Sequence, residues 1–233
     1  MMKPLADCQL YAFIDTAYFH GRAPEVFAQQ LCDGGADLIQ LRAKKSTADE
    51  IRRMAEKILP VTRRANVGLV INDHPDIARE TGAELCHLGQ EDFFDAGYKN
   101  VSELKGGDGS PSCPSDSGRG VALGEHALPE LRIGLSTHAP EQAKRALAAG
   151  PDYIAIGPVY ATGTKPMAKP VTLEYVRWAA ANVTIPWFAI GGINLRTLDE
   201  VLAAGAKRIC VVSAILNATD VMKACLKFRQ RLV

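Results

Sequence analysis

The stretch AAGPDYIAI, residues 148–156, ends an amphipathic segment with small residues, places a glycine after them and then begins an apolar run. The same order recurs in DGGADLIQL at 33–41, TGAELCHL at 81–88 and AAGAKRICV at 203–211. Glycine at such a point supplies the left-handed conformation that ends a helix and turns the chain back. These joints predict helices that each lead directly into a strand, as in the repeated βα units of a parallel sheet.

Short runs rich in Leu, Ile and Val recur eight times and alternate with stretches of helical periodicity. We expect strands at Leu10–Ile14, Leu38–Leu41, Val67–Ile71, Glu84–Leu88, Arg132–Leu135, Tyr153–Ile156, Trp187–Ile190 and Arg208–Val212. The clearest helical stretches are Ala23–Asp33, Thr47–Arg63, Pro140–Ala149, Thr172–Ala181 and Leu195–Ala204. This alternation predicts an α/β fold of the (β/α)8 TIM-barrel type, and 233 residues suit a single domain over 1–233.

Residues 106–120, GGDGSPSCPSDSGRG, break the rhythm because they are rich in Gly, Ser, Pro and Asp and have no apolar face. We expect a flexible insertion there, in the connection before the fifth strand.

The overall composition excludes several classes of function. The 27 Lys and Arg against 26 Asp and Glu give a net charge of +1, so no global field favours nucleic acid or a membrane surface. No run approaches the roughly 20 apolar residues that span a bilayer, and the start, MMKPLADCQLYAF, has no secretory-signal pattern. The six cysteines lack metal-ligand spacing and are expected to be free thiols, which together with the missing signal predicts a cytoplasmic protein.

Polar residues and glycines follow the expected strands, and in a barrel the chemistry lies at the carboxyl ends of the strands. From the second strand to the eighth they are Gln40, Arg42 and Lys44; Asn72 and Asp73; Gln90 and Asp92; Ser136, Thr137 and His138; Thr162 to Lys165; Gly191 and Gly192; and Ser213. Any one of these could be an ordinary solvated loop residue, but together they converge on one end of the expected barrel.

Their chemistry predicts two anion sites. Arg42, Lys44 and Lys165 are cations suited to phosphate oxygens. The carboxylates Asp73 and Asp92 would repel those oxygens unless a hard cation lay between, so we infer Mg2+ and a diphosphate substrate. The glycine pair after the seventh strand and the Val-Ser pair after the eighth occupy the usual phosphate position of a barrel. No pairing of a nucleophile with a base is evident; His87 is expected to be a core residue, and His138 is left open.

The segments QLRAKK, VINDHPDIA, HLGQED, LSTH, GPVYATGTK, AIGGIN and VVSAI resemble, in order and approximate spacing, the signature segments of bacterial thiamine-phosphate synthases. The resemblance runs from Leu10 to Ile215 and omits only the insertion. It implies a (β/α)8 barrel that couples 4-amino-5-hydroxymethyl-2-methylpyrimidine diphosphate to 4-methyl-5-hydroxyethylthiazole phosphate or its carboxylated form. Thiamine phosphate and diphosphate would be the products.

The resemblance also implies residue roles. The pyrimidine diphosphate would be held by Gln40, Leu41, Arg42, Ala43, Lys44, Asn72, Ser136 and Lys165, and Mg2+ by Asp73 and Asp92. The thiazole phosphate would be held by Thr162, Gly163, Thr164, Gly192, Val212 and Ser213. The implied catalytic residues are Arg42, Lys44, Ser136 and Lys165, acting on the leaving diphosphate.

The sequence departs from the family pattern at two positions. Ala43 stands where a Glu is common after the arginine, and Ala161 where a Pro is common before the threonines. Neither change removes an implied metal ligand or phosphate contact.

Two other readings stay open at this stage. A thiazole tautomerase-like isomerase of the same superfamily would handle one thiazole phosphate and would have little use for the cations and carboxylates of a diphosphate site. A phospho-ligand binding protein without turnover belongs to a different class, and release of diphosphate would separate it from an enzyme. The partners expected are small molecules, and the oligomeric state, a homo-oligomer included, is left open.

Overall fold

A closed barrel of eight parallel strands forms the centre of the protein, and the computed structural model describes residues 2–19, 21–105, 130–162 and 169–232. The strands pair in chain order and β8 returns to β1. They are β1 Leu10–Asp15, β2 Leu38–Arg42, β3 Gly68–Asn72, β4 Leu85–Gly89, β5 Arg132–Thr137, β6 Tyr153–Ile156, β7 Trp187–Ile190 and β8 Ile209–Val211. The predicted (β/α)8 barrel is confirmed, whereas the insertion expected at 106–120 lies outside the described residues.

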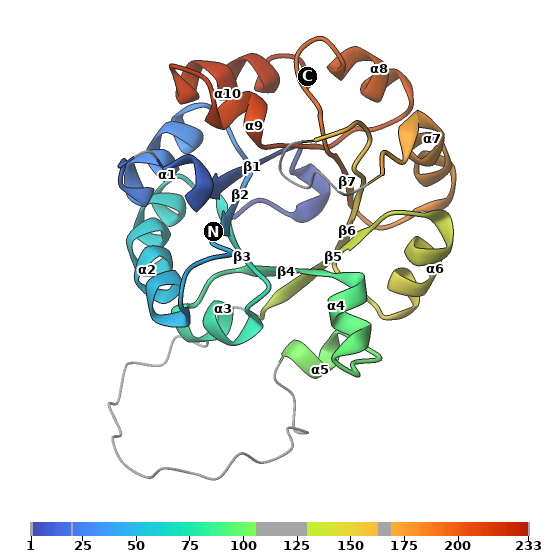
Figure 1. Cartoon of the computed structure of the whole chain (residues 1–233), viewed down its shortest axis with the longest axis horizontal. Helices are drawn as coiled ribbons and strands as arrows, with labels where there is room; N and C mark the ends of the chain where they lie inside the picture. The colour runs from blue at the N-terminus through green and yellow to red at the C-terminus, as the bar shows by residue number, and fades with distance from the viewer. Residues whose placement is uncertain (1, 20, 106–129, 163–168, 233) are drawn as a thin grey trace, which may run out of the picture.

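Helices form a ring around the strands, and the chain passes once around this ring from its blue start to its red end (Figure 1). Within the described residues they are α1 Pro24–Asp33, α2 Ala48–Arg64, α3 Pro75–Thr81, α4 Gln90–Asp95, α5 Ser102–Lys105, α6 Pro140–Ala148, α7 Thr172–Asn182, α8 Leu198–Ala203, α9 Ser213–Leu216 and α10 Val221–Arg229, with short 3-10 helices at Leu5–Asp7 and Thr16–Tyr18. None of the described helices is long and apolar enough to cross a membrane.

The predicted joints between helices and strands are confirmed. Gly35, Gly82, Gly150 and Gly205 all have positive φ angles, at 83°, 74°, 73° and 102°. A side chain is strained in this left-handed region, so glycine is the residue that allows the chain to turn from helix to strand.

The observed helices differ from the expected ones in two ways. The helix expected to start at Leu195 begins three residues later, because the Asn194 backbone N–H donates to Thr197 Oγ1 at 3.0 Å and Asn194 Oδ1 accepts from the Arg196 N–H at 2.9 Å, which stabilises a turn. Helices α3, α4, α5, α9 and α10, which have four to nine residues, were not among the clearest helical stretches of the sequence.

Aromatic rings fill the inside of the barrel. Tyr11 and Tyr153 each meet Phe188 edge-on, with ring centroids 5.3 and 5.7 Å apart. Gly134 on β5 makes room for Tyr153, since a Cβ there would lie 2.1 Å from the Tyr153 Cζ. Large rings and a glycine are therefore matched across neighbouring strands.

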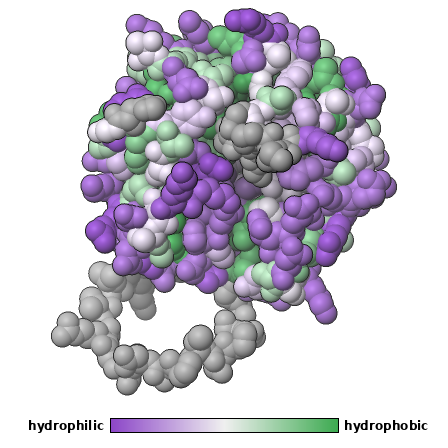
Figure 2. All heavy atoms as spheres, viewed as in Figure 1, coloured by the Kyte–Doolittle hydropathy of each residue, from purple (hydrophilic) through white to green (hydrophobic). Residues whose placement is uncertain are grey.

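The outer surface is predominantly polar on the face shown in Figure 2, where hydrophobic residues form small separate groups. Among the described residues, only Val26, Leu195 and Leu226 are large hydrophobic residues with exposed side chains. The five described cysteines are free thiols, as expected.

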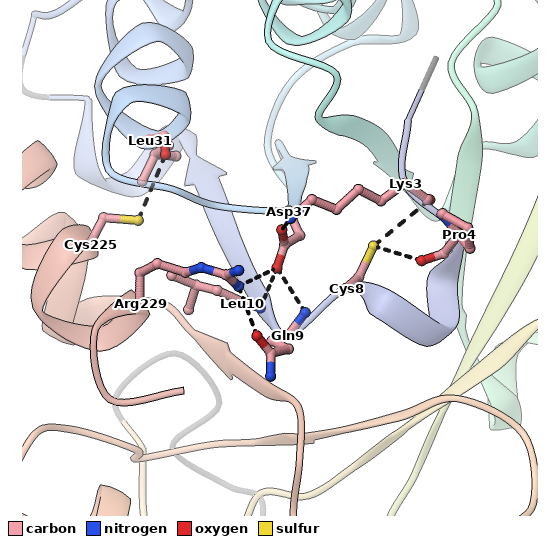
Figure 3. A network of polar contacts seen from close by, with 9 residues as sticks. All are labelled: Lys3, Pro4, Cys8, Gln9, Leu10, Leu31, Asp37, Cys225 and Arg229. Atoms are coloured by element: carbon pink, nitrogen blue, oxygen red, sulfur yellow. Dashed lines mark hydrogen bonds and ion pairs between the residues drawn. The ribbon is translucent and has the colours of Figure 1, made fainter. Parts of the chain in front are cut away.

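A buried carboxylate ties both ends of the chain to the amino-terminal end of the barrel (Figure 3). Asp37, just before β2, accepts hydrogen bonds through Oδ2 from the backbone N–H groups of Gln9 and Leu10 at 2.8 and 3.1 Å. Arg229 Nη1, at the end of α10, donates to the same oxygen at 3.0 Å, and Lys3 Nζ contacts Oδ1. The network lies at the end opposite the strand ends singled out above, where barrel residues serve stability.

We predict that Asp37→Asn lowers the free energy of unfolding by about 3 kcal/mol, because it removes a buried charge from two cations and turns one acceptor into a donor. Asp33→Asn is the control, since Asp33 is exposed on α1 and its loss is expected to cost less than about 0.5 kcal/mol. Urea unfolding followed by circular dichroism measures both. Equal stability of the two variants would contradict a stabilising role for the Asp37 network.

Candidate active site

A pocket opens at the carboxyl ends of the strands and contains about 930 Å3 of empty space, its open mouth included. Of the sequence-predicted residues it is lined by Gln40, Arg42, Lys44, Asn72, Asp73, Asp92, Ser136, Thr162, Gly192, Val212 and Ser213. The structure thus brings together residues from both predicted anion sites.

Five residues with a predicted role are not among the lining ones, and neither are Gln90 and Thr137, which are 3% and 0% exposed. Gly163, Thr164 and Lys165 lie outside the described residues. Leu41 and Ala43 are 1% and 6% exposed and belong to the hydrophobic core, because side chains alternate along and just beyond β2. The side chain that replaces the family's usual Glu at position 43 therefore makes no contact with the pocket.

Arg42 is held by a carboxylate that the sequence analysis did not single out. Asp15 ends β1 directly opposite Arg42 on β2, and its Oδ2 lies 2.7 Å from Arg42 Nη1. The other oxygen, Oδ1, accepts from the backbone N–H of Ala17 at 3.0 Å. Asp15 is 3% exposed, so this ion pair is shielded from solvent and fixes the guanidinium at the rim. The rule that found the other site residues, a polar residue right after an apolar run, also points to Asp15.

Asp73 has a strained backbone and a shared carboxylate oxygen. Its φ angle is +65°, an uncommon value for a residue other than glycine, and its N–H donates to the His87 carbonyl at 2.9 Å. Lys44 Nζ and Asn72 Nδ2 both lie 2.6 Å from the same oxygen, Oδ2. This arrangement positions a carboxylate beside a cation and an amide in the mouth of the barrel.

Asp92 lies in the first turn of α4, a helix that the sequence did not reveal. Its carboxylate folds back over Gly89, where a Cβ would lie 2.6 Å from Asp92 Oδ2. The helix N-terminus favours a negative charge at this position. No group of three or more His, Cys, Asp or Glu suited to a metal occurs in the described ranges, so Asp73 and Asp92 could hold a cation only with further oxygens from elsewhere.

A second polar region is formed by backbone after β7 and β8. Gly191 and Gly192 have φ angles of +101° and +67°. Val212 precedes α9, a helix of four residues that begins at Ser213 beside the pocket. A short extra helix after the eighth strand is where barrels commonly bind phosphate, through backbone N–H groups with no acceptor in the helix.

Three further residues, Cys210, His138 and His87, also line the pocket. Cys210 is 2% exposed, and burial raises the pKa of its thiol well above the ordinary value, so it stays protonated. His138 Nδ1 contacts the Gly157 carbonyl, which requires a proton on that nitrogen. His87 is buried, as expected, yet it also lines the pocket.

A parallel eight-stranded barrel with ionisable residues gathered at the carboxyl ends of its strands is the architecture of a (β/α)8-barrel enzyme. The family model of thiamine monophosphate synthase matches residues 10–104 and 121–215. The chain belongs to this thiamine monophosphate synthase family.

Individual proteins agree with this assignment. The thiamine-phosphate synthase of Thermus thermophilus is 43% identical over 200 residues, covering 85% of this chain and 84% of that protein. That of Lawsonia intracellularis is 35% identical over 228 residues, covering 97% of this chain and 94% of that protein. The solved structure of thiamine phosphate pyrophosphorylase from Pyrococcus furiosus has a TM-score of 0.78 at 27% identity and covers 99% of this chain and 98% of that one.

We predict that Gly89→Ala moves the Asp92 carboxylate without unfolding the protein. The backbone at Gly89, with φ −64° and ψ 133°, accepts any residue, so the stability change is expected to stay within about 0.5 kcal/mol. The added methyl group would push Asp92 Oδ2 away, because the gap is only 2.6 Å. The Mg2+ concentration for half-maximal activity should rise about tenfold. An unchanged Mg2+ dependence would show that the position of Asp92 does not matter.

Proposed function

We propose that the chain is a thiamine-phosphate synthase, coupling 4-amino-5-hydroxymethyl-2-methylpyrimidine diphosphate to 4-methyl-5-hydroxyethylthiazole phosphate and releasing diphosphate. The observation that carries the proposal is one continuous pocket lined both by Arg42, Lys44, Asp73 and Asp92 and by the backbone around Gly192 and Ser213. Two phosphorylated substrates need two anion sites within reach of each other. The names of the relatives that cover most of the chain support the same activity.

The diphosphate site is formed by β2, β3 and α4. Arg42 is held in place by Asp15, whereas Lys44 pairs with Asp73 through a side chain that is 50% exposed. This long, half-exposed lysine can exchange the carboxylate for a phosphate oxygen of the substrate. Asn72 and Ser136 add neutral polar groups on the same rim. Arg42 would therefore orient the diphosphate, whereas Lys44 would move from Asp73 to a phosphate oxygen when the diphosphate binds.

Asp73 and Asp92 fit a bound Mg2+, because two hard carboxylates in a pocket with phosphate oxygens make the donor set that this ion prefers. Lys44 and Asn72 both donate to Oδ2 of Asp73, so these two hydrogen bonds do not involve Oδ1. Mg2+ bound there would neutralise charge on the diphosphate.

The thiazole phosphate site would lie across the pocket. Gly192 presents backbone without a side chain, and a Cβ there would lie 2.6 Å from Tyr160 Cβ and 2.7 Å from the Ala161 carbonyl oxygen. The loop after β6 therefore packs closely on this turn and brings Thr162 to the pocket. Ser213 and the start of α9 complete the polar surface.

The reaction that fits this pocket needs no protein nucleophile. The bond between the pyrimidine methylene carbon and the diphosphate oxygen breaks, and its electron pair leaves with diphosphate. The electron-rich aminopyrimidine stabilises the carbocation, and the thiazole nitrogen donates the pair that forms the new bond. A carboxylated thiazole also loses carbon dioxide, and the ring carbon that held it takes up a proton from solvent. Arg42 and Lys44 would stabilise the growing negative charge on the leaving group.

The pocket also weighs against the rival functions. A thiazole tautomerase would need one phosphate site, whereas this pocket gathers two cations and two carboxylates apart from the glycine turn. Incubation with thiazole phosphate alone separates the two, since only a tautomerase would isomerise it. A protein that binds without turnover would release no diphosphate from the two substrates.

We predict that excess chelator abolishes formation of thiamine phosphate and that Mg2+ restores it. Asp92→Asn should lower the rate about a hundredfold or more, because it weakens the cation site at the leaving group. Asp95→Asn is the control, since Asp95 is an exposed carboxylate at the far end of α4 and does not line the pocket. Full activity in chelator, or equal rates of the two variants, would remove the cation from the proposal.

We further predict that the two anion sites can be separated by substitution. Lys44→Met should weaken binding of a non-reacting pyrimidine diphosphonate about tenfold and leave thiazole phosphate binding unchanged. Lys45→Met is the control, because the adjacent Lys45 is exposed and does not line the pocket. Ser213→Ala should weaken thiazole phosphate selectively. Calorimetry measures the Kd of each ligand for each protein, and loss of both ligands in either pocket variant would mean that the sites overlap.

A further inference from the structure

Four buried polar side chains form a chain of contacts across the floor of the pocket. Gln40 Nε2 donates to the Tyr11 hydroxyl, which lies 3.2 Å from the Tyr153 hydroxyl. The Tyr153 hydroxyl in turn lies 3.1 Å from His87 Nδ1. The two end residues, Gln40 and His87, line the pocket, whereas the two tyrosines lie beneath it. The chain therefore links two pocket residues through groups that do not line the pocket.

Both hydroxyls stay protonated in the barrel interior. Tyr11 and Tyr153 are 1% and 0% exposed, and burial raises the pKa of each phenol well above its ordinary value. A phenol has one proton to donate, so each hydroxyl can donate once while it accepts from its other neighbour.

The donation from Gln40 Nε2 to Tyr11 gives the chain a direction in which each hydroxyl can donate to the next group. Tyr11 accepts from Gln40, and in the direction that continues this donation the Tyr11 proton goes to Tyr153 and the Tyr153 proton goes to His87 Nδ1. Nδ1 is thus an acceptor, and a neutral His87 ring carries its proton on Nε2. At the other end the nitrogen of the Gln40 amide is occupied, so Oε1 is the part of the amide that can accept a hydrogen bond.

The hydroxyls are not required by packing. Phenylalanine would fill the same space against Phe188 without placing two oxygens in the interior. The position of Tyr153 is specified closely, since Gly134 leaves room for its ring. Buried hydroxyls are costly unless they are hydrogen-bonded, and a fully bonded chain rigidifies the groups at its ends.

We propose that Tyr11 and Tyr153 are positioning residues whose hydroxyls fix the Gln40 amide with Oε1 as the acceptor for an amino group on the pyrimidine ring. The inference rests on the proposed function and adds a basis for substrate choice. An amino group donates to Oε1, whereas an oxo group at the same place would bring two acceptors together. The site would therefore select a 4-aminopyrimidine over its 4-oxo counterpart.

The test compares two non-reacting ligands, the methylene diphosphonates of the 4-amino and the 4-oxo pyrimidine. The intact protein should bind the amino ligand about 30-fold more tightly, and Tyr11→Phe should reduce this preference to about threefold, since the released amide can turn its N–H toward the oxo group. Inorganic diphosphate, which lacks the ring, should bind both proteins equally. Tyr153→Phe should reduce the preference in the same direction, because Tyr11 then loses its acceptor.

Tyr175→Phe is the matched control. Tyr175 is 4% exposed, its hydroxyl lies 2.8 Å from Thr137 Oγ1, and it does not line the pocket. It should lower the melting temperature as the other substitutions do and leave the ligand preference intact. An unchanged preference in both Tyr11→Phe and Tyr153→Phe would overturn the positioning role. Failure of the intact protein to form thiamine phosphate would instead overturn the proposed function, so the two failures are distinguishable.

Discussion

Parallel pairing around a closed ring places the carboxyl end of every strand at one rim, and the site depends on this constraint. The register sets Asp15 opposite Arg42, Asn72 opposite His87 and Gly89 opposite Ser136. Residues far apart in the sequence thereby become neighbours without long loops to carry them. A slip of one residue in any strand would turn its rim side chain into the outer core.

The two ends of the barrel divide the tasks of the protein. At the amino-terminal end, Asp37 joins β1, the N-terminal segment and α10 in a network that serves stability. At the other end, charged groups are gathered in the pocket, and the backbone at Asp73 is held in a strained conformation. The interior between them contains the packed rings of Tyr11, Tyr153 and Phe188 together with the two tyrosine hydroxyls, so the floor of the pocket is both core and part of the site.

The sequence predicted the barrel well because apolar runs and glycine joints are local signals, and each expected strand overlaps an observed one. Most site residues at the rim were predicted by the same pattern, since a polar residue directly after an apolar run lies at the carboxyl end of its strand. Leu41 and Ala43 show the limit of assigning a binding role to every residue of a family motif, because the alternation of side chains along β2 places these two in the core. The Tyr11–Tyr153 chain was not predicted, since residues inside apolar runs look like ordinary core and only the tertiary fold brings β1, β2, β4 and β6 together across the floor.

The central claim is that one pocket holds both substrates and joins them. The most direct measurement supplies the purified protein with pyrimidine diphosphate, thiazole phosphate and Mg2+ and quantifies the products by chromatography. The account predicts thiamine phosphate and diphosphate in equal amounts, and neither when one substrate is left out. Isomerisation of the thiazole phosphate without release of diphosphate, or binding of both substrates with no product, would contradict it.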